Sequence, residues 1–200
     1  MKAKILLAAF KSLGAREEND CEKICRTLVA GRPERVDYVV LEMGPNSESQ
    51  LLHALSSEPG GILLTHEDGS LRWHHFHIES QAFDLEQPHP SISWDWGRGL
   101  DAAQMPYLRK ISSEFAPEAK AAVGAMRPIE VFANLATTEQ QDPFWCNRAY
   151  YLALEWGQPR KKPVLFVRVG TSGTEACKLT PLRRILDLMM EKTVEEPNHA

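Results

Sequence analysis

Five short apolar runs are spaced along the chain, and each has the composition of a buried strand. Pro or Gly comes immediately before three of them, as is common where a turn leads into a strand. The runs are nearly continuous rather than alternating, which is typical of strands covered on both faces of a sheet. They occupy residues 5–10, 36–41, 62–65, 129–133 and 164–169.

Apolar residues at helical spacing lie between most of these runs. The predicted helices occupy residues 17–29, 47–56, 106–125, 144–156 and 181–192, and Pro117 is expected to break the third. Strands and helices therefore alternate along most of the chain. This order predicts an α/β fold: a single-domain α/β/α sandwich with a mostly parallel central sheet flanked by helices.

Two stretches interrupt the alternation. Residues 66–85 are predicted to form a polar turn followed by an aromatic, His-rich segment. Residues 86–104 contain several Pro, Gly and Trp residues and are predicted to form a long loop, the kind of segment that often carries binding surface. We expect the domain to span residues 1–193 and residues 194–200 to form a flexible tail.

The composition narrows the class of protein. A chain of 200 residues fits one ordinary domain, and its net charge of −4 argues against nucleic acid or an anionic membrane as a partner. The apolar run at 5–10 ends at Lys11, too short for a signal peptide or a membrane span. The four Cys residues have neither disulfide-rich nor zinc-site spacing, so we expect a cytoplasmic protein with reduced thiols and no metal or cofactor.

Cys146 lies near the start of a predicted helix. Asp142 can cap that helix and Pro143 fits its first turn, which places Cys146 within the first turn or so. There the helix dipole and the unsatisfied backbone N–H groups favour a thiolate and can stabilise an oxyanion. The alternative is a small buried residue that packs the helix terminus, because free Cys is among the most buried residue types.

The sequence around Cys146 matches the pattern of a known family. Trp-Cys-Asn-Arg-Ala-Tyr-Tyr-Leu-Ala-Leu at 145–154, followed by Pro-Val-Leu-Phe-Val-Arg-Val at 163–169, resembles the C-terminal half of pyroglutamyl peptidase I. Ile-Leu-Leu-Ala-Ala-Phe-Lys-Ser-Leu-Gly at 5–14 is similar to its N-terminal strand and turn, and Ile-Glu-Ser-Gln-Ala-Phe-Asp at 78–84 to the segment that carries its catalytic Glu. The matches keep the family's order over essentially the whole chain.

The resemblance implies a fold, a reaction and a site. It implies a cysteine peptidase that removes an N-terminal pyroglutamyl or similar small acyl residue from a peptide, or cleaves a small amide, through a thioester. Position by position, Cys146 takes the nucleophile's place, Glu79 that of the carboxylate orienting the catalytic His, and Arg168 that of the His itself. Phe10 and Leu13 stand where the family has aromatic residues against the pyrrolidone ring. Because the family often forms tetramers, the resemblance also implies a capacity to form homo-oligomers.

The sequence departs from the family pattern at several positions, and these departures lead to two functional hypotheses. Arg168 can hold Cys146 as a thiolate by charge, but a guanidinium has no lone pair with which to shuttle a proton. Leu13 replaces an aromatic ring, and residues 65–70 lack the family's Gly-Gln-x-x-Gly-Arg turn. The chain is therefore either a peptidase of reduced activity or an inactive relative that binds a ligand or partner. Both hypotheses place the sulfur of Cys146 in an open cleft.

Three His residues just before Glu79 leave further alternatives open. If this segment is a strand, His75, His77 and Glu79 share one face. One of His74, His75 and His77 could then replace the missing catalytic His, or the face could hold a zinc-type metal. The third interpretation is a half-exposed polar face of a strand.

Overall fold

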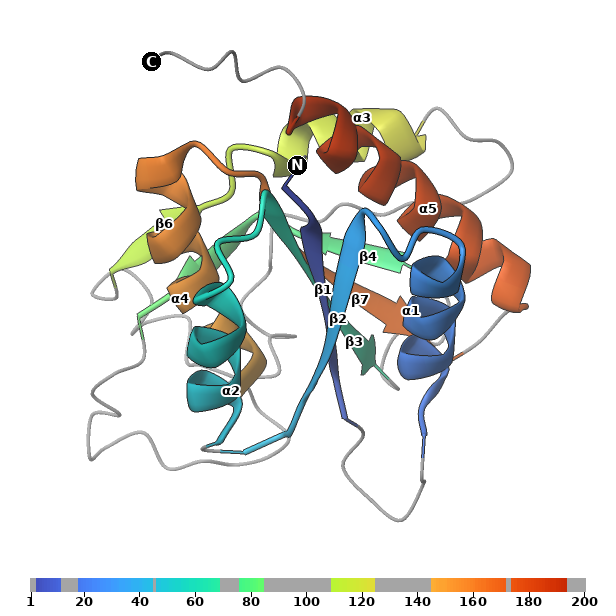
Figure 1. Cartoon of the computed structure of the whole chain (residues 1–200), viewed down its shortest axis with the longest axis horizontal. Coiled ribbons are helices and arrows are strands. Elements are labelled where there is room, and N and C mark those ends of the chain that lie inside the picture. Colours follow the sequence, from blue (N-terminus) through green and yellow to red (C-terminus); the bar gives the residue numbers. More distant parts are fainter. Residues whose placement is uncertain are drawn as a thin grey trace, which may run out of the picture.

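A five-stranded sheet lies at the centre of the computed structural model, which describes residues 3–11, 18–44, 46–68, 76–84, 109–124, 145–171 and 174–193 (Figure 1). The strand order is β2-β1-β3-β7-β4. The bounds of these strands are Val36–Leu41 for β2, Ile5–Phe10 for β1, Gly61–Asp68 for β3, Val164–Gly170 for β7 and Phe76–Glu79 for β4. Only β4 is antiparallel to its neighbour, so the prediction of a mostly parallel sheet is confirmed.

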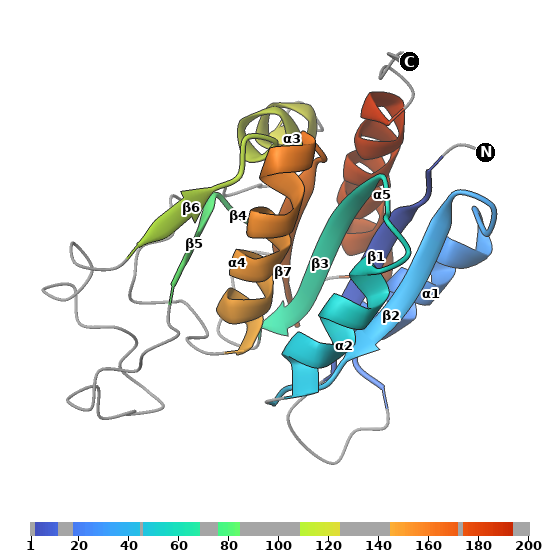
Figure 2. The ribbon, with the colours of Figure 1, turned by 60° about the vertical axis from the view of Figure 1, so that its left-hand side comes forward.

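Helices cover both faces of the sheet, as predicted. One face packs against α1 (Asp20–Ala30), α3 (Ala116–Gly124) and α5 (Glu175–Lys192). The other face packs against α2 (Asn46–Leu55) and α4 (Trp145–Gly157), as Figure 2 shows. Each interface is a separate apolar cluster, and the buried residues between the sheet and helices α2 and α4 are called here the α2/α4 layer.

Three smaller elements extend the α4 side of the molecule. The strands β5 (Gln81–Phe83) and β6 (Lys110–Ser112) form an antiparallel pair, and a 3₁₀ turn at Gln158–Arg160 follows α4. The helix predicted over 106–125 is therefore wrong over 109–115, because pairing with β5 draws Lys110–Ser112 into a strand. Pro117 lies in the first turn of α3, where a missing N–H costs nothing, and does not break the helix.

The other bounds differ from the predictions for local reasons. β3 continues to Asp68, where a polar turn was predicted, because it pairs with β7 as far as Gly170. α1 begins at Asp20 because Asn19 caps it: the Glu22 N–H donates to Asn19 Oδ1 and the Asn19 N–H to Glu22 Oε2, both at 2.8 Å. The helix predicted over 181–192 already begins at Glu175.

Some predicted segments cannot be compared with the structure. The strand at 129–133, the loop at 86–104 and the tail at 194–200 lie outside the described residues. Within the described residues no helix has both the length and the apolar character that a membrane span requires.

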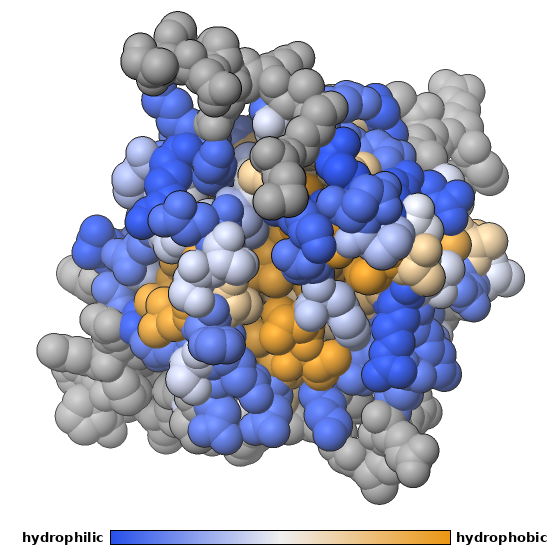
Figure 3. All heavy atoms as spheres, in the orientation of Figure 1, coloured by the Kyte–Doolittle hydropathy of each residue, from blue (hydrophilic) through white to orange (hydrophobic). Residues whose placement is uncertain are grey.

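The edge strand β2 carries apolar surface. Its central residues Tyr38, Val39 and Val40 are half-buried, and among the described residues no strand pairs with its outer edge. In the space-filling view of Figure 3, apolar side chains gather where Figure 1 shows β2. Among the described strands, this edge of the sheet therefore combines apolar side chains with a backbone edge that no strand pairs.

Candidate active site

Polar side chains replace apolar ones at the carboxyl end of β3. Ile62 and Leu64 belong to the α2/α4 layer, whereas Leu63 packs on the other face. Because side chains alternate along a strand, His66 and Asp68 continue the row of Ile62 and Leu64 towards α4. His66 is 7% exposed and is thus buried at the end of this row.

The neighbouring strands carry polar side chains at the same level. Arg168 follows Val164 and Phe166 on the α4 side of β7, while His77 and Glu79 lie on the face of β4 opposite to the apolar Ile78. In the sheet register, Arg168 is opposite His66 on one side and His77 on the other. His66, Arg168 and His77 therefore form a line across three strands, called here the polar row.

Two carboxylates hold the guanidinium of Arg168. Its Nε and Nη2 lie 2.6 and 2.5 Å from Glu79 Oε1, and its Nη1 lies 2.7 Å from Asp68 Oδ2. Arg168 is 1% exposed and Glu79 3%, so the ion pairs are buried. Burial by itself lowers the pKa of Arg168, but the two carboxylates outweigh this and raise it above its ordinary value. The guanidinium is thus permanently charged, and its bonds point to the carboxylates.

Cys146 is the second residue of α4, within the first turn as predicted. The predicted cap at Asp142 and Pro143 lies outside the described residues. The Cys146 side chain is 1% exposed, belongs to the α2/α4 layer with Phe10, and donates from Sγ to Met43 Sδ at 3.4 Å. The expectation of an open cleft is therefore wrong, because apolar side chains of the layer surround the thiol.

Two contacts fix α4 to the segment that carries Glu79. Asn147, next to Cys146, accepts a hydrogen bond from the backbone N–H of Phe83 at 2.9 Å and donates one to its carbonyl at 2.7 Å. The Tyr150 hydroxyl donates to the Glu79 carbonyl at 2.9 Å. These bonds define how the start of α4 lies against β4 and β5.

The predicted site residues divide into two groups. Cys146, Glu79, Arg168 and Phe10 all face the α2/α4 layer, and the ring of Phe10 meets that of His66 edge-on with centroids 6.2 Å apart. Leu13, His74 and His75 lie outside the described residues. The interpretation of this segment as a half-exposed polar face of a strand is wrong for His77 and Glu79, because both side chains are buried. No cluster of three or more His, Cys, Asp or Glu side chains that could hold a metal occurs in the part of the chain that the structure describes.

Solved structures of pyrrolidone carboxyl peptidases align with nearly the whole chain. The protein from Thermus thermophilus is 17% identical at a TM-score of 0.68, covering 92% of this chain and 98% of that one. Bacillus amyloliquefaciens pyroglutamyl peptidase I is 14% identical at 0.69, covering 96% and 98%. The pyrrolidone carboxyl peptidase from Thermococcus litoralis is 12% identical at 0.67, covering 96% and 95%. The chain has the pyrrolidone carboxyl peptidase fold. No protein-family model and no curated protein matches the sequence.

Two polar residues that face the α2/α4 layer, His66 and Asp68, are not predicted from the sequence as site residues. The sequence predicts a polar turn at His66 and Asp68, yet these residues extend β3 and place an imidazole and a second carboxylate beside Arg168. The signal that could have found them is their spacing: positions 62, 64, 66 and 68 all lie two residues apart on one strand face.

The other buried thiols lie on the opposite face of the sheet. Cys21 and Cys25 of α1 pack in the apolar cluster there. Burial raises the pKa of Cys21 well above its ordinary value and that of Cys25 to about 12, partly offset by a contact of 3.3 Å between Cys25 Sγ and Thr65 Oγ1. Both thiols are therefore protonated at neutral pH.

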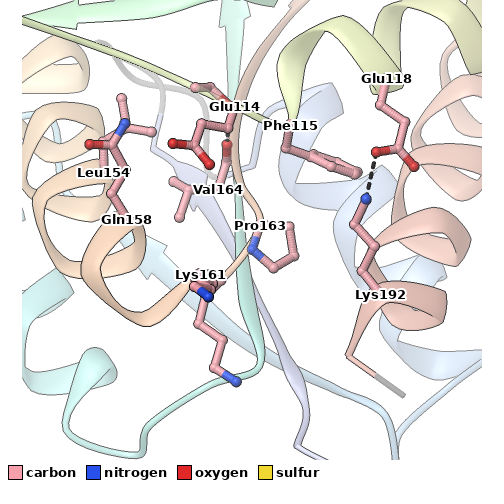
Figure 4. A pocket seen from close by; sticks show the side chains of 11 residues that line it. Glu114, Phe115, Glu118, Leu154, Gln158, Lys161, Pro163, Val164 and Lys192 are labelled. Atoms are coloured by element: carbon pink, nitrogen blue, oxygen red, sulfur yellow. Dashed lines mark hydrogen bonds and ion pairs between the residues drawn. The ribbon is translucent and has the colours of Figure 1, made fainter. Parts of the chain in front are cut away.

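A cleft of about 440 Å³ lies at the other end of α4 (Figure 4). Pro163 and Val164 at the start of β7 and Gln158 after α4 line it, with the Glu118–Lys192 ion pair at 2.6 Å on its far side. Cys146 is at the beginning of α4 and Arg168 near the end of β7, so this cleft is separate from the candidate site.

Proposed function

We propose that the chain is a cysteine peptidase of pyroglutamyl peptidase type, with Cys146 as the nucleophile. It removes an N-terminal pyroglutamyl or similar small acyl residue from a peptide, or cleaves a small amide. The observation that carries the proposal is that the Cys146 thiol, the His66 imidazole and the Glu79 carboxylate face one buried layer. The likeness to proteins described as pyrrolidone carboxyl peptidases supports it.

The reaction proceeds by acyl transfer through sulfur. A base takes the proton of Cys146, the sulfur attacks the carbonyl carbon, and the protonated base gives that proton to the leaving amine as the C–N bond breaks. Water then hydrolyses the thioester and restores the thiol. Backbone N–H groups in the first turn of α4 stabilise the oxyanion formed in both steps.

Arg168 does not perform the proton transfer in this reaction. Its guanidinium is held by Glu79 and Asp68 and offers no lone pair. Its role is to position the two carboxylates and to balance part of their charge. The burial of Cys146 adds a further requirement, because side chains of the α2/α4 layer have to move before a substrate carbonyl can reach the sulfur. Both features predict slow turnover.

A second candidate function is an inactive relative that binds a ligand or partner. The observation that favours it is the ion pairing of Glu79: its Oε1 accepts a hydrogen bond from Arg168 Nε and forms an ion pair with Nη2, so this oxygen is paired with Arg168 rather than with an imidazole. Thermal stabilisation of a Cys146→Ala variant by a pyroglutamyl peptide would show binding that does not depend on the thiol.

Turnover of a pyroglutamyl-aminomethylcoumarin substrate separates the two candidates. We expect release of the fluorophore by the wild type and none by Cys146→Ala, whereas the matched variant Cys177→Ala, on α5, keeps wild-type activity. Wild-type turnover equal to that of Cys146→Ala would favour the binding protein. Activity that survives in Cys146→Ala would refute the role of this thiol.

Three further properties belong to the proposal. The partner is a peptide N-terminus or a small amide rather than nucleic acid or a membrane, in keeping with the net charge of −4. The protein acts in the cytoplasm and is able to form homo-oligomers, which light scattering coupled to size-exclusion chromatography would detect.

A further inference from the structure

We infer that His66 is the base that exchanges a proton with Cys146. The inference rests on the proposed function and deepens it: the base is a residue of β3, whereas the family's catalytic His corresponds to Arg168 on β7. His66 lies opposite Arg168 in the parallel register and faces the same layer. Adjacent strands are about 4.8 Å apart, so the imidazole is displaced by one strand only from the position of the guanidinium.

The strand order places His66 on the same side of Arg168 as the residue that contacts Cys146. Met43, which follows β2, touches the Cys146 sulfur at 3.4 Å. Phe10 at the end of β1 shares the α2/α4 layer with Cys146, and its ring meets the His66 ring edge-on. In the order β2-β1-β3-β7-β4, Met43 and Phe10 therefore lie on the same side of Arg168 as His66 does.

His77 is the other imidazole of the polar row, and its position is less suitable. It lies on β4, at the far edge of the sheet from β2, with Arg168 between it and His66. The ion pairs between Arg168 and Glu79 join β7 to β4 on that side. A proton carried by His77 would have to pass the guanidinium, whereas His66 lies on the Phe10 side of it.

Each proton in the proposed step is accounted for. The neutral imidazole of His66 accepts the thiol proton of Cys146 as the S–C bond forms, and the imidazolium returns it to the leaving amine as the C–N bond breaks. In the second half, His66 accepts a proton from water as the C–O bond forms, and gives it to the Cys146 sulfur as the C–S bond of the thioester breaks. No oxidant, reductant or metal is required.

Matched variants of the two imidazoles test the inference. His66→Gln and His77→Gln each replace a buried His of the polar row by a side chain that still forms hydrogen bonds. We expect His66→Gln to lower kcat/KM for the coumarin substrate by about 10²–10⁴, the usual contribution of a general base, and His77→Gln to stay close to the wild type. Circular dichroism and urea unfolding establish that each variant is folded, and His66→Asn replaces His66→Gln if that variant is not.

Alkylation of Cys146 by iodoacetamide provides a second measurement that does not need turnover. Peptide mass spectrometry follows Cys146 in each variant, with Cys177 in the same sample as the internal reference. We expect His66→Gln to slow the alkylation of Cys146 and His77→Gln to leave it unchanged. If the wild type lacks turnover but shows this dependence, the proposed function fails while the pairing of His66 with Cys146 stands.

Three results would overturn the inference. The first is a loss of activity in His77→Gln equal to or larger than that in His66→Gln. The second is an active wild type whose kcat/KM does not change in His66→Gln. The third is an alkylation rate of Cys146 that is the same in the wild type and in folded His66→Gln.

Discussion

Replacement of Arg168 by Met should destabilise the protein strongly, because it leaves two carboxylates in the α2/α4 layer without their cation. Glu79 is 3% exposed and the Asp68 side chain 12%, and the shortest contacts of each with the guanidinium are 2.5 and 2.7 Å. Removing one partner of a buried ion pair typically costs about 3–5 kcal/mol, since the charge that remains is poorly solvated. We expect a loss of about that size in the free energy of unfolding, measured by urea denaturation at neutral pH.

A pair near the surface supplies the control. Arg32 and Asp187 form an ion pair of similar length, 2.6 Å, but their side chains are 23% and 35% exposed. Arg32→Met should cost about 1 kcal/mol or less, because water solvates the carboxylate that remains. Arg168→Lys should fall between the wild type and Arg168→Met, since an ammonium keeps the charge but not the planar fork that reaches both carboxylates.

The stability of Arg168→Met should depend on pH in a direction that follows from its unpaired carboxylates. In the variant, protonation of an unpaired buried carboxylate removes the charge that destabilises the fold. The folded variant therefore binds protons more readily than its unfolded chain, and the gap between variant and wild type should narrow as the pH falls. A loss below about 1 kcal/mol, equal to that of Arg32→Met, would refute the conclusion that the carboxylates depend on Arg168.

Two further predictions concern α4 and the buried thiols. Asn147→Ala removes both hydrogen bonds to the Phe83 backbone and should lower the free energy of unfolding by about 1–3 kcal/mol, measured by urea denaturation; a value near zero would show that α4 does not need this clamp. Because burial raises the pKa of Cys21 and Cys25, that of Cys25 to about 12, iodoacetamide at mildly alkaline pH should modify the half-buried Cys177 well before either of them in the folded protein. Modification of Cys25 at the rate seen in urea would contradict this order.

The sheet could be predicted from the sequence where its strands are buried on both faces. The apolar runs at 5–10 and 36–41 coincide with β1 and β2, because continuous apolar residues suit a strand between two layers of helices. The helix that carries Cys146 could also be predicted, since its apolar residues recur at helical spacing and its bounds depend little on the rest of the fold.

Elements that depend on a distant partner could not be predicted. Lys110–Ser112 form a strand only because β5 is beside them, and no alternation over three residues indicates this. The end of β3 has polar residues where apolar ones are expected, and its pairing with β7 is a contact between segments far apart in the chain. Local patterns carry no information about such contacts.

The candidate site was predicted in its parts but not in its arrangement. The Cys146 segment and the order of the matches led to Cys146, Glu79 and Arg168, and all three face the α2/α4 layer. The burial of the thiol could not be read from its position at the start of a helix. Nor could the second carboxylate on Arg168, because Asp68 was assigned to a turn rather than to a strand face.

The carboxylates that pair with Arg168 also bear on the inferred role of His66, because they face the same α2/α4 layer. Arg168 contributes one positive charge, and Glu79 and Asp68 contribute two carboxylates, so these three residues together retain negative charge. When Cys146 gives up its proton, the imidazolium formed on His66 lies on the same strand face as Asp68, two residues away. Asp68→Asn removes a carboxylate from the strand face that carries His66 and keeps the Arg168–Glu79 pair. It should therefore weaken the dependence of Cys146 alkylation on His66, measured by peptide mass spectrometry in the single and double variants.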